Sequence, residues 1–328
     1  MEFVVNNCFN KISIVFFIIL ILFLSGCFYI KEESNAPEFV TWQGLGPDKW
    51  ASIWLIKRYI SPKSKITILP VGTPVQLDHS FDIPDGQYRR KPGITTFSAL
   101  RNKFSIEGRI IVKIEGVLQD IEIDFWKKNK FGESAFIEQG FRLLQERFGR
   151  DQVPFNCYIA FFDNVELTLR KHQIDNPTLL LPNDSCASGV KAKPQLVNQI
   201  LIKDLMQEMQ KKKRVKFVDA RESFEFSEGR IPGAYNLQIR HVNTKTVKPF
   251  LDSELVIAYC VKDFRGFELA KALQDNGVKN VAILDPFGLK GWVNSGLPIV
   301  GKKGLSELQA NNELEMCINN DSRCKAHL

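Results

Sequence analysis

A cysteine stands where a strand-like run meets a helix-like stretch. The apolar run, residues 255–259, ends at Cys260, and the helix-like stretch that follows ends near Asn276. This pattern predicts a strand–loop–helix unit with the thiol in the loop. Loop N–H groups and the positive end of the helix dipole then surround the sulfur, and Arg265 adds a charge. Such surroundings lower the pKa of a cysteine, so we expect Cys260 to be largely ionised near neutral pH.

The loop between the cysteine and the arginine is short. Four residues separate Cys260 from Arg265. We expect the neighbours of these two residues to bind the substrate, namely Val261, Lys262, Asp263, Phe264 and Gly266. A cradle of this size suits a sulfur that carries one extra atom, whereas the longer Cys-x5-Arg loop of phosphatases holds a tetrahedral oxyanion. The alternative is that Cys260 is a small buried hydrophobic residue, as free cysteines usually are.

The segments around this loop resemble the rhodanese (sulfurtransferase) family. Residues 218–222 (Val-Asp-Ala-Arg-Glu) match the family's Asp-x-Arg-Glu segment, and residues 228–237 match its Gly-His-Ile-Pro-Gly-Ala-x-Asn segment. After the cysteine, residues 280–284, Trp292 and residues 296–298 match its closing strand, tryptophan and Gly-x-Pro. The resemblance implies a parallel α/β sheet with flanking helices in the C-terminal part of the chain.

Two departures from the family pattern concern the site. Arg230 replaces the usual histidine, and residues 285–288 (Asp-Pro-Phe-Gly) replace the usual Gly-Gly before the tryptophan. We expect the second change to reshape one wall of the pocket. By resemblance, Asp219 and Arg221 belong to the site and fix the loop from beneath; the alternative is an ordinary structural ion pair.

The resemblance implies sulfur transfer through a Cys260 persulfide. The thiolate attacks the outer sulfur of a small anionic donor such as thiosulfate, and a thiol, cyanide or a partner protein accepts the sulfur. Backbone N–H groups of residues 261–266 stabilise the anionic sulfur. Lys262 attracts the donor, although Asp263 beside it partly cancels the field. We expect no cofactor and no metal, because the four histidines show no ligand spacing.

Two other functions compete with this prediction. The first is a non-catalytic module in which the rhodanese fold recognises an oxyanion or a protein partner. The intact Cys-x4-Arg loop favours the enzyme, whereas the changed Gly-Gly segment weakens the match to the family's active site. The second is a redox or arsenate-type reductase, which the short loop and the absence of a neighbouring cysteine disfavour. The oligomeric state stays open.

The N-terminus predicts export and a lipid anchor. Lys11 precedes an uncharged run, residues 12–24, which is too short to span a bilayer as a helix. The run is typical of a secretory signal, and residues 24–27 (Leu-Ser-Gly-Cys) resemble the lipobox of bacterial lipoproteins. The resemblance implies cleavage before Cys27 and fatty acylation of its thiol. We expect an envelope protein on the periplasmic side of the inner or outer membrane, the outer slightly favoured. The alternative is an uncleaved anchor.

Five cysteines follow the predicted lipid site. If Cys317 pairs with Cys324 and Cys157 pairs with Cys186, Cys260 is left free. Such pairs are typical of an oxidising compartment. The alternative is that all five are reduced, since pairing does not follow from sequence.

The region before the rhodanese-like part resembles the chromate-resistance family of bacteria. The matching residues are Trp42, the helix-like residues 48–60, residues 81–84 and residues 95–97. We expect Asp48 to be the N-cap of that helix and Pro62 to stop it. A strand is expected at residues 65–69 and a further amphipathic helix from Phe136 to Phe148.

A basic turn replaces the histidine and cysteine that this second family tends to carry before its Thr-Phe pair. Arg89, Arg90 and Lys91 stand there, so metal or thiol chemistry is not expected. They either bind an oxyanion such as chromate, sulfate or thiosulfate or form a solvated turn. In the preceding helix, Trp54 and Arg58 either share a functional face with Asp48 or serve packing and exposure.

The expected organisation has six parts. The net charge of +7 does not indicate nucleic-acid binding in an exported chain. The predicted parts are a signal peptide at 1–26, a tether at 27–39, a mixed α+β chromate-resistance-like domain at 40–172, a linker at 173–196, the rhodanese-like domain at 197–301 and a polar tail at 302–328.

Overall fold

The computed structural model describes residues 36–76, 78–124, 127–171, 174–187 and 197–326. Residues 37–328 form one compact unit. It contains two sheets, one near the start of the described chain and one near its end. The expected signal peptide and Cys27 lie outside the described residues. In the part of the chain that is described, no helix is long and apolar enough to cross a membrane.

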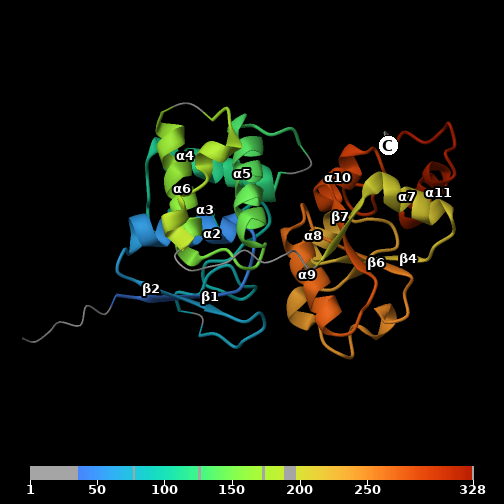
Figure 1. Ribbon diagram of the computed structural model, residues 1–328, viewed down its shortest axis with the longest axis horizontal. Coiled ribbons are helices and arrows are strands. Elements are labelled where there is room, and N and C mark those ends of the chain that lie inside the picture. Colours follow the sequence, from blue (N-terminus) through green and yellow to red (C-terminus); the bar gives the residue numbers. More distant parts are fainter. Residues whose placement is uncertain (1–35, 77, 125–126, 172–173, 188–196, 327–328) are drawn as a thin grey trace, which may run out of the picture. The chain divides into compact units, whose positions relative to one another are not determined.

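The first region builds helices on a small parallel sheet. Strands β1 (Glu38–Trp42) and β2 (Lys65–Leu69) pair in parallel, and the helices lie on one side of them in Figure 1. The helical elements are α2 (Pro47–Leu55), the π-helical η1 (Ile56–Ile60), α3 (Thr96–Lys103), α4 (Arg109–Glu122), α5 (Glu133–Phe148) and α6 (Phe155–Arg170). The predicted strand at residues 65–69 and the predicted helix ending at Phe148 are confirmed.

Asp48 caps a helix other than the expected one. Gly46 is the N-cap of α2 and Pro47 occupies its first turn, where a missing N–H costs nothing. The buried carboxylate of Asp48 instead accepts hydrogen bonds from the N–H groups of Thr96 (2.8 Å) and Phe97 (3.0 Å) at the start of α3. The expectation of a local cap was wrong, because the side chain points to a second helix and ties it to the first.

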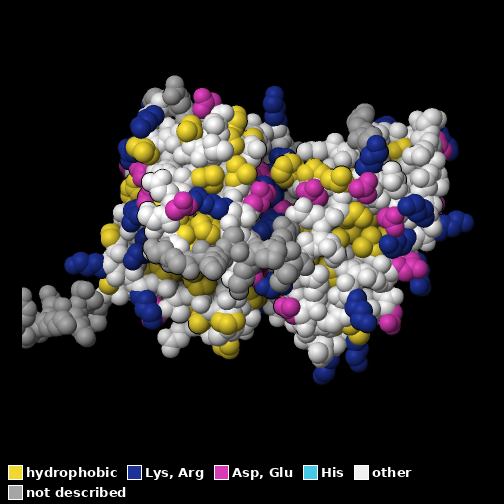
Figure 2. Space-filling model, in the orientation of Figure 1, with side chains coloured by type: hydrophobic (Ala, Val, Ile, Leu, Met, Phe, Trp, Pro, Cys, Tyr) yellow, Lys and Arg dark blue, Asp and Glu magenta, His cyan; other side chains and the backbone are white. Residues whose placement is uncertain are grey.

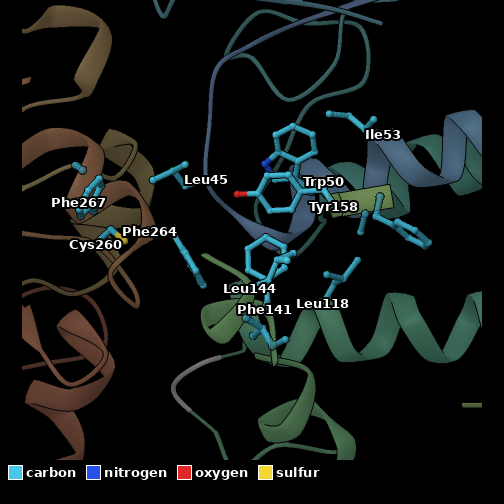
Figure 3. Packing of buried hydrophobic residues seen from close by; sticks show 14 of the residues in the cluster. Leu45, Trp50, Ile53, Leu118, Phe141, Leu144, Tyr158, Cys260, Phe264 and Phe267 are labelled. Atoms are coloured by element: carbon cyan, nitrogen blue, oxygen red, sulfur yellow. The ribbon is translucent and has the colours of Figure 1, made fainter. Parts of the chain in front are cut away.

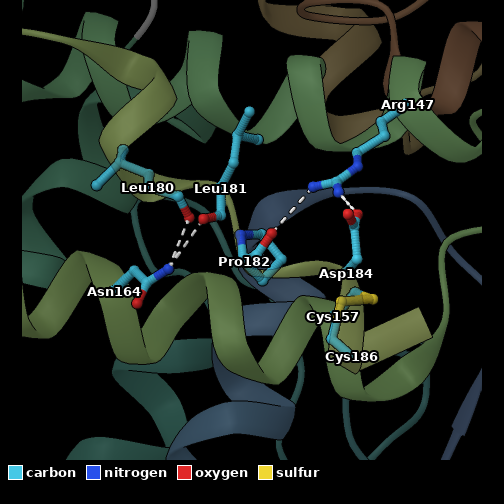
Figure 4. The surroundings of a disulfide bond; sticks show 8 residues. All are labelled: Arg147, Cys157, Asn164, Leu180, Leu181, Pro182, Asp184 and Cys186. Atoms are coloured by element: carbon cyan, nitrogen blue, oxygen red, sulfur yellow. Dashed lines mark hydrogen bonds and ion pairs between the residues drawn. A yellow bond between two sulfur atoms is a disulfide. The ribbon is translucent and has the colours of Figure 1, made fainter. Parts of the chain in front are cut away.

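Part of the expected linker packs on the first region. Turns η2 (Pro177–Leu180) and η3 (Asp184–Ala187) are 3-10 helices, and a disulfide joins Cys157 of α6 to Cys186. In Figure 4, Asn164 donates to the carbonyls of Leu180 and Leu181 (3.3 and 3.2 Å). Arg147 donates to the carbonyl of Pro182 and forms an ion pair with Asp184. Residues 177–187 are therefore held against α5 and α6.

The second region is a parallel sheet with helices on both faces (Figure 1). Within residues 197–326 the strand order is β3-β7-β6-β4-β5, and all pairs are parallel. The strands are β3 (Asn198–Leu201), β4 (Val215–Asp219), β5 (Tyr235–Asn236), β6 (Leu255–Tyr259) and β7 (Val281–Asp285). The helical elements are α7 (Ile202–Gln210), α8 (Ser223–Glu228), η4 (Ile239–His241), η5 (Lys248–Phe250), α9 (Phe264–Asp275), α10 (Gly288–Asn294) and α11 (Glu307–Ile318). The predicted fold class is confirmed.

The central strand β6 is buried on both faces. Ile257 and Tyr259 pack in a cluster with residues of α7, α10 and α11. Val256 and Ala258 point the other way, into a cluster that continues into the helices of the first region. Figure 3 shows this shared core, in which Phe264 beside Cys260 extends toward Phe141. Since side chains alternate along a strand, β6 connects both cores.

The expected polar tail contains a packed helix. Helix α11 begins with a capping box between Ser306 and Gln309. Its buried residues are Ala310, Leu314 and Cys317. Disulfides join Cys317 to Cys324 and Cys157 to Cys186, so the pairing considered above is present. Among the described cysteines, Cys260 is the free one.

Candidate active site

Cys260 is the first residue after β6 and lies in the loop that leads into α9. Its side chain is buried, with the residue only 3% exposed. The backbone N–H groups of Lys262 and Gly266 donate to the sulfur. A Cβ at Gly266 would lie 3.1 Å from the Cα of Tyr259, so the absence of a side chain lets the helix approach the strand closely. The expected strand–loop–helix unit is present.

Burial dominates the acidity of the thiol. Loss of solvation raises the pKa of Cys260 to about 11, because a buried thiolate is costly. Arg265 and the two N–H groups lower this pKa, whereas Asp263 raises it. The prediction of a largely ionised thiol near neutral pH was therefore wrong for this structure. The loop has the expected donors, but tertiary packing removes the water that would stabilise the charge.

The rate of Cys260 alkylation is expected to follow this raised pKa. Only the thiolate reacts, so the rate with iodoacetamide should rise by about tenfold per pH unit from pH 7 to 10 and level off near pH 11. Mass spectrometry of the Cys260 peptide measures the rate. In urea the same cysteine should titrate near its ordinary value of about 8.5. A plateau already at pH 8 in the folded protein would contradict a buried neutral thiol.

Arg265, at the start of α9, is held by a carboxylate of the second region. Its two terminal nitrogens donate to the two oxygens of Glu225 at 2.8 and 2.9 Å. Although burial raises the pKa of Glu225, Arg265 outweighs it and lowers that pKa to about 2. Glu225 also accepts from the N–H of Glu222 in the capping box of α8. A bidentate pair of this kind fixes the guanidinium in orientation.

Asp219 and Arg221 form a second bidentate pair at the end of β4. The side chains are 0% and 1% exposed, and Arg221 Nη2 lies 2.6 Å from Asp219 Oδ2. Arg221 also donates to the carbonyls of Glu225 (3.2 Å) and Gly229 (2.6 Å). The pair therefore connects β4 with α8 and with Gly229, which follows that helix. Neither residue lines the cavity that contains Cys260.

The two charged residues of the cysteine loop are paired with the first region. Lys262 Nζ donates to Glu138 of α5. Asp263 accepts from Arg142 of the same helix and from Arg150 Nη2, the latter at 2.6 Å. Lys262 is thus neutralised by a carboxylate and Asp263 by two guanidinium groups. We expected Asp263 to cancel part of the field of Lys262, but each of the two residues forms ion pairs of its own with the first region.

Aromatic packing also holds the cysteine loop against the first region. The ring of Phe264 meets that of Phe141 edge to face at 5.7 Å. Arg142 lies over the Phe264 ring at 4.7 Å, and Arg150 lies over the Phe267 ring at 5.0 Å. The ion pairs and the rings together place the cysteine loop against α5 (Figure 3).

The first residues of α10 (Gly288–Asn294) brace the loop from behind. The N–H groups of Leu289 and Lys290 donate to the carbonyls of Cys260 and Val261, both at 2.9 Å. Gly288 has a φ of +51°, and a Cβ there would lie 1.8 Å from the carbonyl oxygen of Lys262. Residues 285–288 were expected to reshape a wall of the pocket. These residues do not line the cavity. Gly288 lies against the backbone of the loop instead, and the two residues after it donate to that backbone.

A cavity of about 160 Å³ contains Cys260, and both regions line it. Of the predicted site residues, Cys260, Val261, Lys262, Phe264 and Arg265 line it, whereas Asp219, Arg221, Asp263 and Gly266 lie outside the lining. From the first region, the charged side chains in the lining are Lys49, Asp82, Arg89, Arg90 and Glu122. Nothing in the spacing of these residues indicated that they would meet the cysteine.

The three residues of the basic turn, Arg89, Arg90 and Lys91, lie in different environments. Arg90 is mostly buried and pairs with Asp48 (3.2 Å) and Glu122 (3.1 Å). Arg89 is exposed at the cavity, and Lys91 is exposed outside its lining. The solvated-turn alternative is therefore wrong for Arg90. Trp54 of α2 and Arg58 of η1 both donate to Asp163 of α6. Trp54 is buried, and Arg58 is a partly exposed charge.

Sequence reasoning missed three groups near the cysteine. Glu225 binds Arg265. The spacing of Glu222 and Glu225 is typical of a capping box, and this signal could have located Glu225. Glu268 of α9 lines the cavity and accepts from the N–H of Leu45 at 2.6 Å. Burial raises the pKa of Glu268 to about 7. Arg240 lines the cavity as well and forms an ion pair with Glu222. The described residues contain no cluster suited to hold a metal ion.

Known proteins resemble the two regions separately. Residues 202–295 match the rhodanese-like domain, and residues 39–168 match the C-terminal domain of ChrB. A sulfurtransferase of Allochromatium vinosum is 30% identical over 109 residues, which are 33% of this chain and 100% of that protein. An uncharacterized protein of Synechocystis is 30% identical over 98 residues, which are 30% of this chain and 54% of that protein.

Two solved structures each resemble about a third of the chain. The BH2092 protein of Bacillus halodurans is 24% identical, with a TM-score of 0.30, over 33% of this chain and 80% of that one. A thiosulfate sulfurtransferase of Pseudomonas aeruginosa is 23% identical, with a TM-score of 0.29, over 32% of this chain and 20% of that one. Both likenesses are too weak to support a comparison of function.

A parallel sheet whose central strand ends in a cysteine loop braced by Arg265 defines a rhodanese-like α/β protein. Since the chain covers the whole of a sulfurtransferase to which it is 30% identical, it belongs to the sulfurtransferase family. Its first region, residues 39–168, is similar to the C-terminal domain of ChrB.

Proposed function

We propose that the protein is a sulfurtransferase that carries sulfane sulfur on Cys260. The observation that carries the proposal is the position of the free thiol of Cys260 at the end of β6, in a cavity that Arg265 also lines. Donated N–H groups and a fixed guanidinium suit the anionic sulfur of a persulfide.

The proposed step conserves atoms and charge. Cys260 loses its proton to solvent, and the thiolate attacks the outer sulfur of thiosulfate. The S–S bond of the donor breaks, and sulfite leaves with the bonding electron pair. Cyanide or a thiol then takes the terminal sulfur and releases the thiolate. Because the pKa of Cys260 is about 11, loading should become faster as pH rises above neutrality.

The size of the cavity favours small reactants. Its volume of about 160 Å³ is below the roughly 300–1,000 Å³ typical of pockets for drug-sized ligands. Thiosulfate and cyanide suit such a space, whereas the side chain of a protein acceptor would need the first region to give way.

Intact mass tests the proposal. After incubation with thiosulfate, the protein should gain about 32 Da for one sulfur, and cyanide should remove it. If neither thiosulfate nor mercaptopyruvate adds sulfur, the sulfurtransferase proposal fails.

The burial of Cys260 favours one second candidate, a binding module without turnover. A thiol with a pKa of about 11 is a poor nucleophile at neutral pH. In this case an oxyanion would bind in the cavity and no persulfide would form. A link to chromate or other oxyanion stress is proposed on the resemblance of residues 39–168 to ChrB.

We also propose that the protein is an envelope lipoprotein anchored through Cys27. The lipobox-like residues 24–27 support this, and so do the two disulfides, which persist in oxidising compartments. Cys27→Ser is expected to abolish incorporation of labelled fatty acid, because the thiol is the acylated atom. Ser25→Ala at the neighbouring position serves as a control that keeps the thiol. Labelling of the Cys27→Ser protein equal to wild type would refute the anchor.

A further inference from the structure

The first region forms about half of the wall of the Cys260 cavity. Its segment before α2 and the turn around Pro84 line the cavity, together with the charged side chains named above. Any donor that reaches the sulfur therefore meets residues of the ChrB-like region. The rhodanese-like region alone would leave this side of the loop open to solvent, so the two regions form one site.

The cations that line the cavity differ in whether they are neutralised. Lys49 pairs with Asp82 at 2.8 Å, and Arg90 pairs with Asp48 and Glu122. From the second region, the paired lining cations are Lys262 (with Glu138), Arg240 (with Glu222) and Arg265 (with Glu225). Among the residues that the structure describes, Arg89 forms no ion pair with any carboxylate, and it is exposed.

We propose that Arg89 binds the anionic group of the sulfur donor at the Cys260 cavity, so that the ChrB-like region supplies the anion-binding half of the site. An anion that bound one of the paired cations would have to displace a carboxylate or share its partner. Arg89 has no such competitor among the described residues, and a guanidinium donates to two oxygens of a sulfonate at once. The inference rests on the proposed function for the identity of the donor.

Arg90 and Arg265 also bring positive charge to the cavity, but in this proposal they do not contact the donor. The charge of Arg265 acts on Arg90, and the charge of Arg90 acts on Glu225, the partner of Arg265. Both are held by carboxylates, so their fields are largely compensated. Among the described cations of the lining, the uncompensated charge is that of Arg89, and it favours dianionic donors over neutral ones.

The test compares Arg89→Gln with Lys91→Gln in the full-length protein. Both residues are exposed and two positions apart in one turn, but only Arg89 lines the cavity. Sulfate, which carries no transferable sulfur, should protect Cys260 from iodoacetamide at pH 9. In Arg89→Gln the half-protecting sulfate concentration should rise by about tenfold, because one charged hydrogen-bonding group is lost. In Lys91→Gln it should stay within about twofold of wild type.

The outcomes separate this inference from the sulfurtransferase proposal. Equal protection in Arg89→Gln and wild type, or equal losses in both variants, would overturn the role of Arg89. The KM for thiosulfate should rise in Arg89→Gln with kcat nearly unchanged, and this effect should shrink at high salt. If thiosulfate loads no sulfur on wild type but sulfate protects Cys260 through Arg89, the anion site stands and the sulfurtransferase proposal falls.

Discussion

Cys260→Ser is expected to abolish sulfur loading by thiosulfate while the protein keeps its fold. Serine is nearly isosteric with cysteine, and its hydroxyl does not form a persulfide. The gain of about 32 Da in intact mass should disappear, and thiocyanate formation from cyanide should fall to background. Circular dichroism and the thermal midpoint should stay close to wild type, because the hydroxyl can accept from the same Lys262 and Gly266 N–H groups.

A double variant that removes the Arg265–Glu225 ion pair complements the Cys260→Ser experiment. Arg265→Gln alone would leave Glu225 buried and unpaired, so Arg265→Gln with Glu225→Gln is the appropriate comparison. The double variant keeps the cysteine and should load sulfur more slowly, since the charge of Arg265 no longer lowers the pKa of Cys260. Undiminished loading of the Cys260→Ser protein would show that the sulfur resides elsewhere.

Asp219→Asn should cause the largest loss of stability among these variants. The change leaves the guanidinium of Arg221, which is 1% exposed, without its carboxylate. Leaving a buried charge unpaired costs about 3–5 kcal/mol. The free energy of unfolding from a urea titration measures this cost. A retained rate of sulfur loading per folded molecule would show that the pair acts by holding the structure.

The chain contains a matched control for this pair. Arg323 binds Asp321 with the same Asp-x-Arg geometry: its N–H and Nε lie 2.9 and 3.0 Å from Asp321 Oδ1, the distances found for Arg221 and Asp219. The side chains of Arg323 and Asp321 are 75% and 26% exposed. Asp321→Asn should therefore leave the unfolding midpoint unchanged, because water solvates the freed guanidinium. Equal effects in the two variants would contradict the role of burial.

The sequence by itself predicted the local units of the fold. The apolar run before Cys260, the helix ending at Phe148 and the strand at residues 65–69 follow from periodicity and from glycine and proline signals. The resemblance of ordered segments around the cysteine predicted the parallel sheet. These features depend on residues close together in the chain, so a sequence pattern records them.

Only the tertiary structure decided the electrostatics of the site. Asp263 and its partner Arg142 are 121 residues apart, and Lys262 and Glu138 are 124 apart. No local pattern connects such residues, and similar charged residues elsewhere in the chain are solvated. The pKa of Cys260 also depends on packing that the sequence does not record. The sequence placed N–H donors and Arg265 around the thiol, but the packing of the first region on the loop excluded water, and the cost of burying a thiolate outweighed those donors.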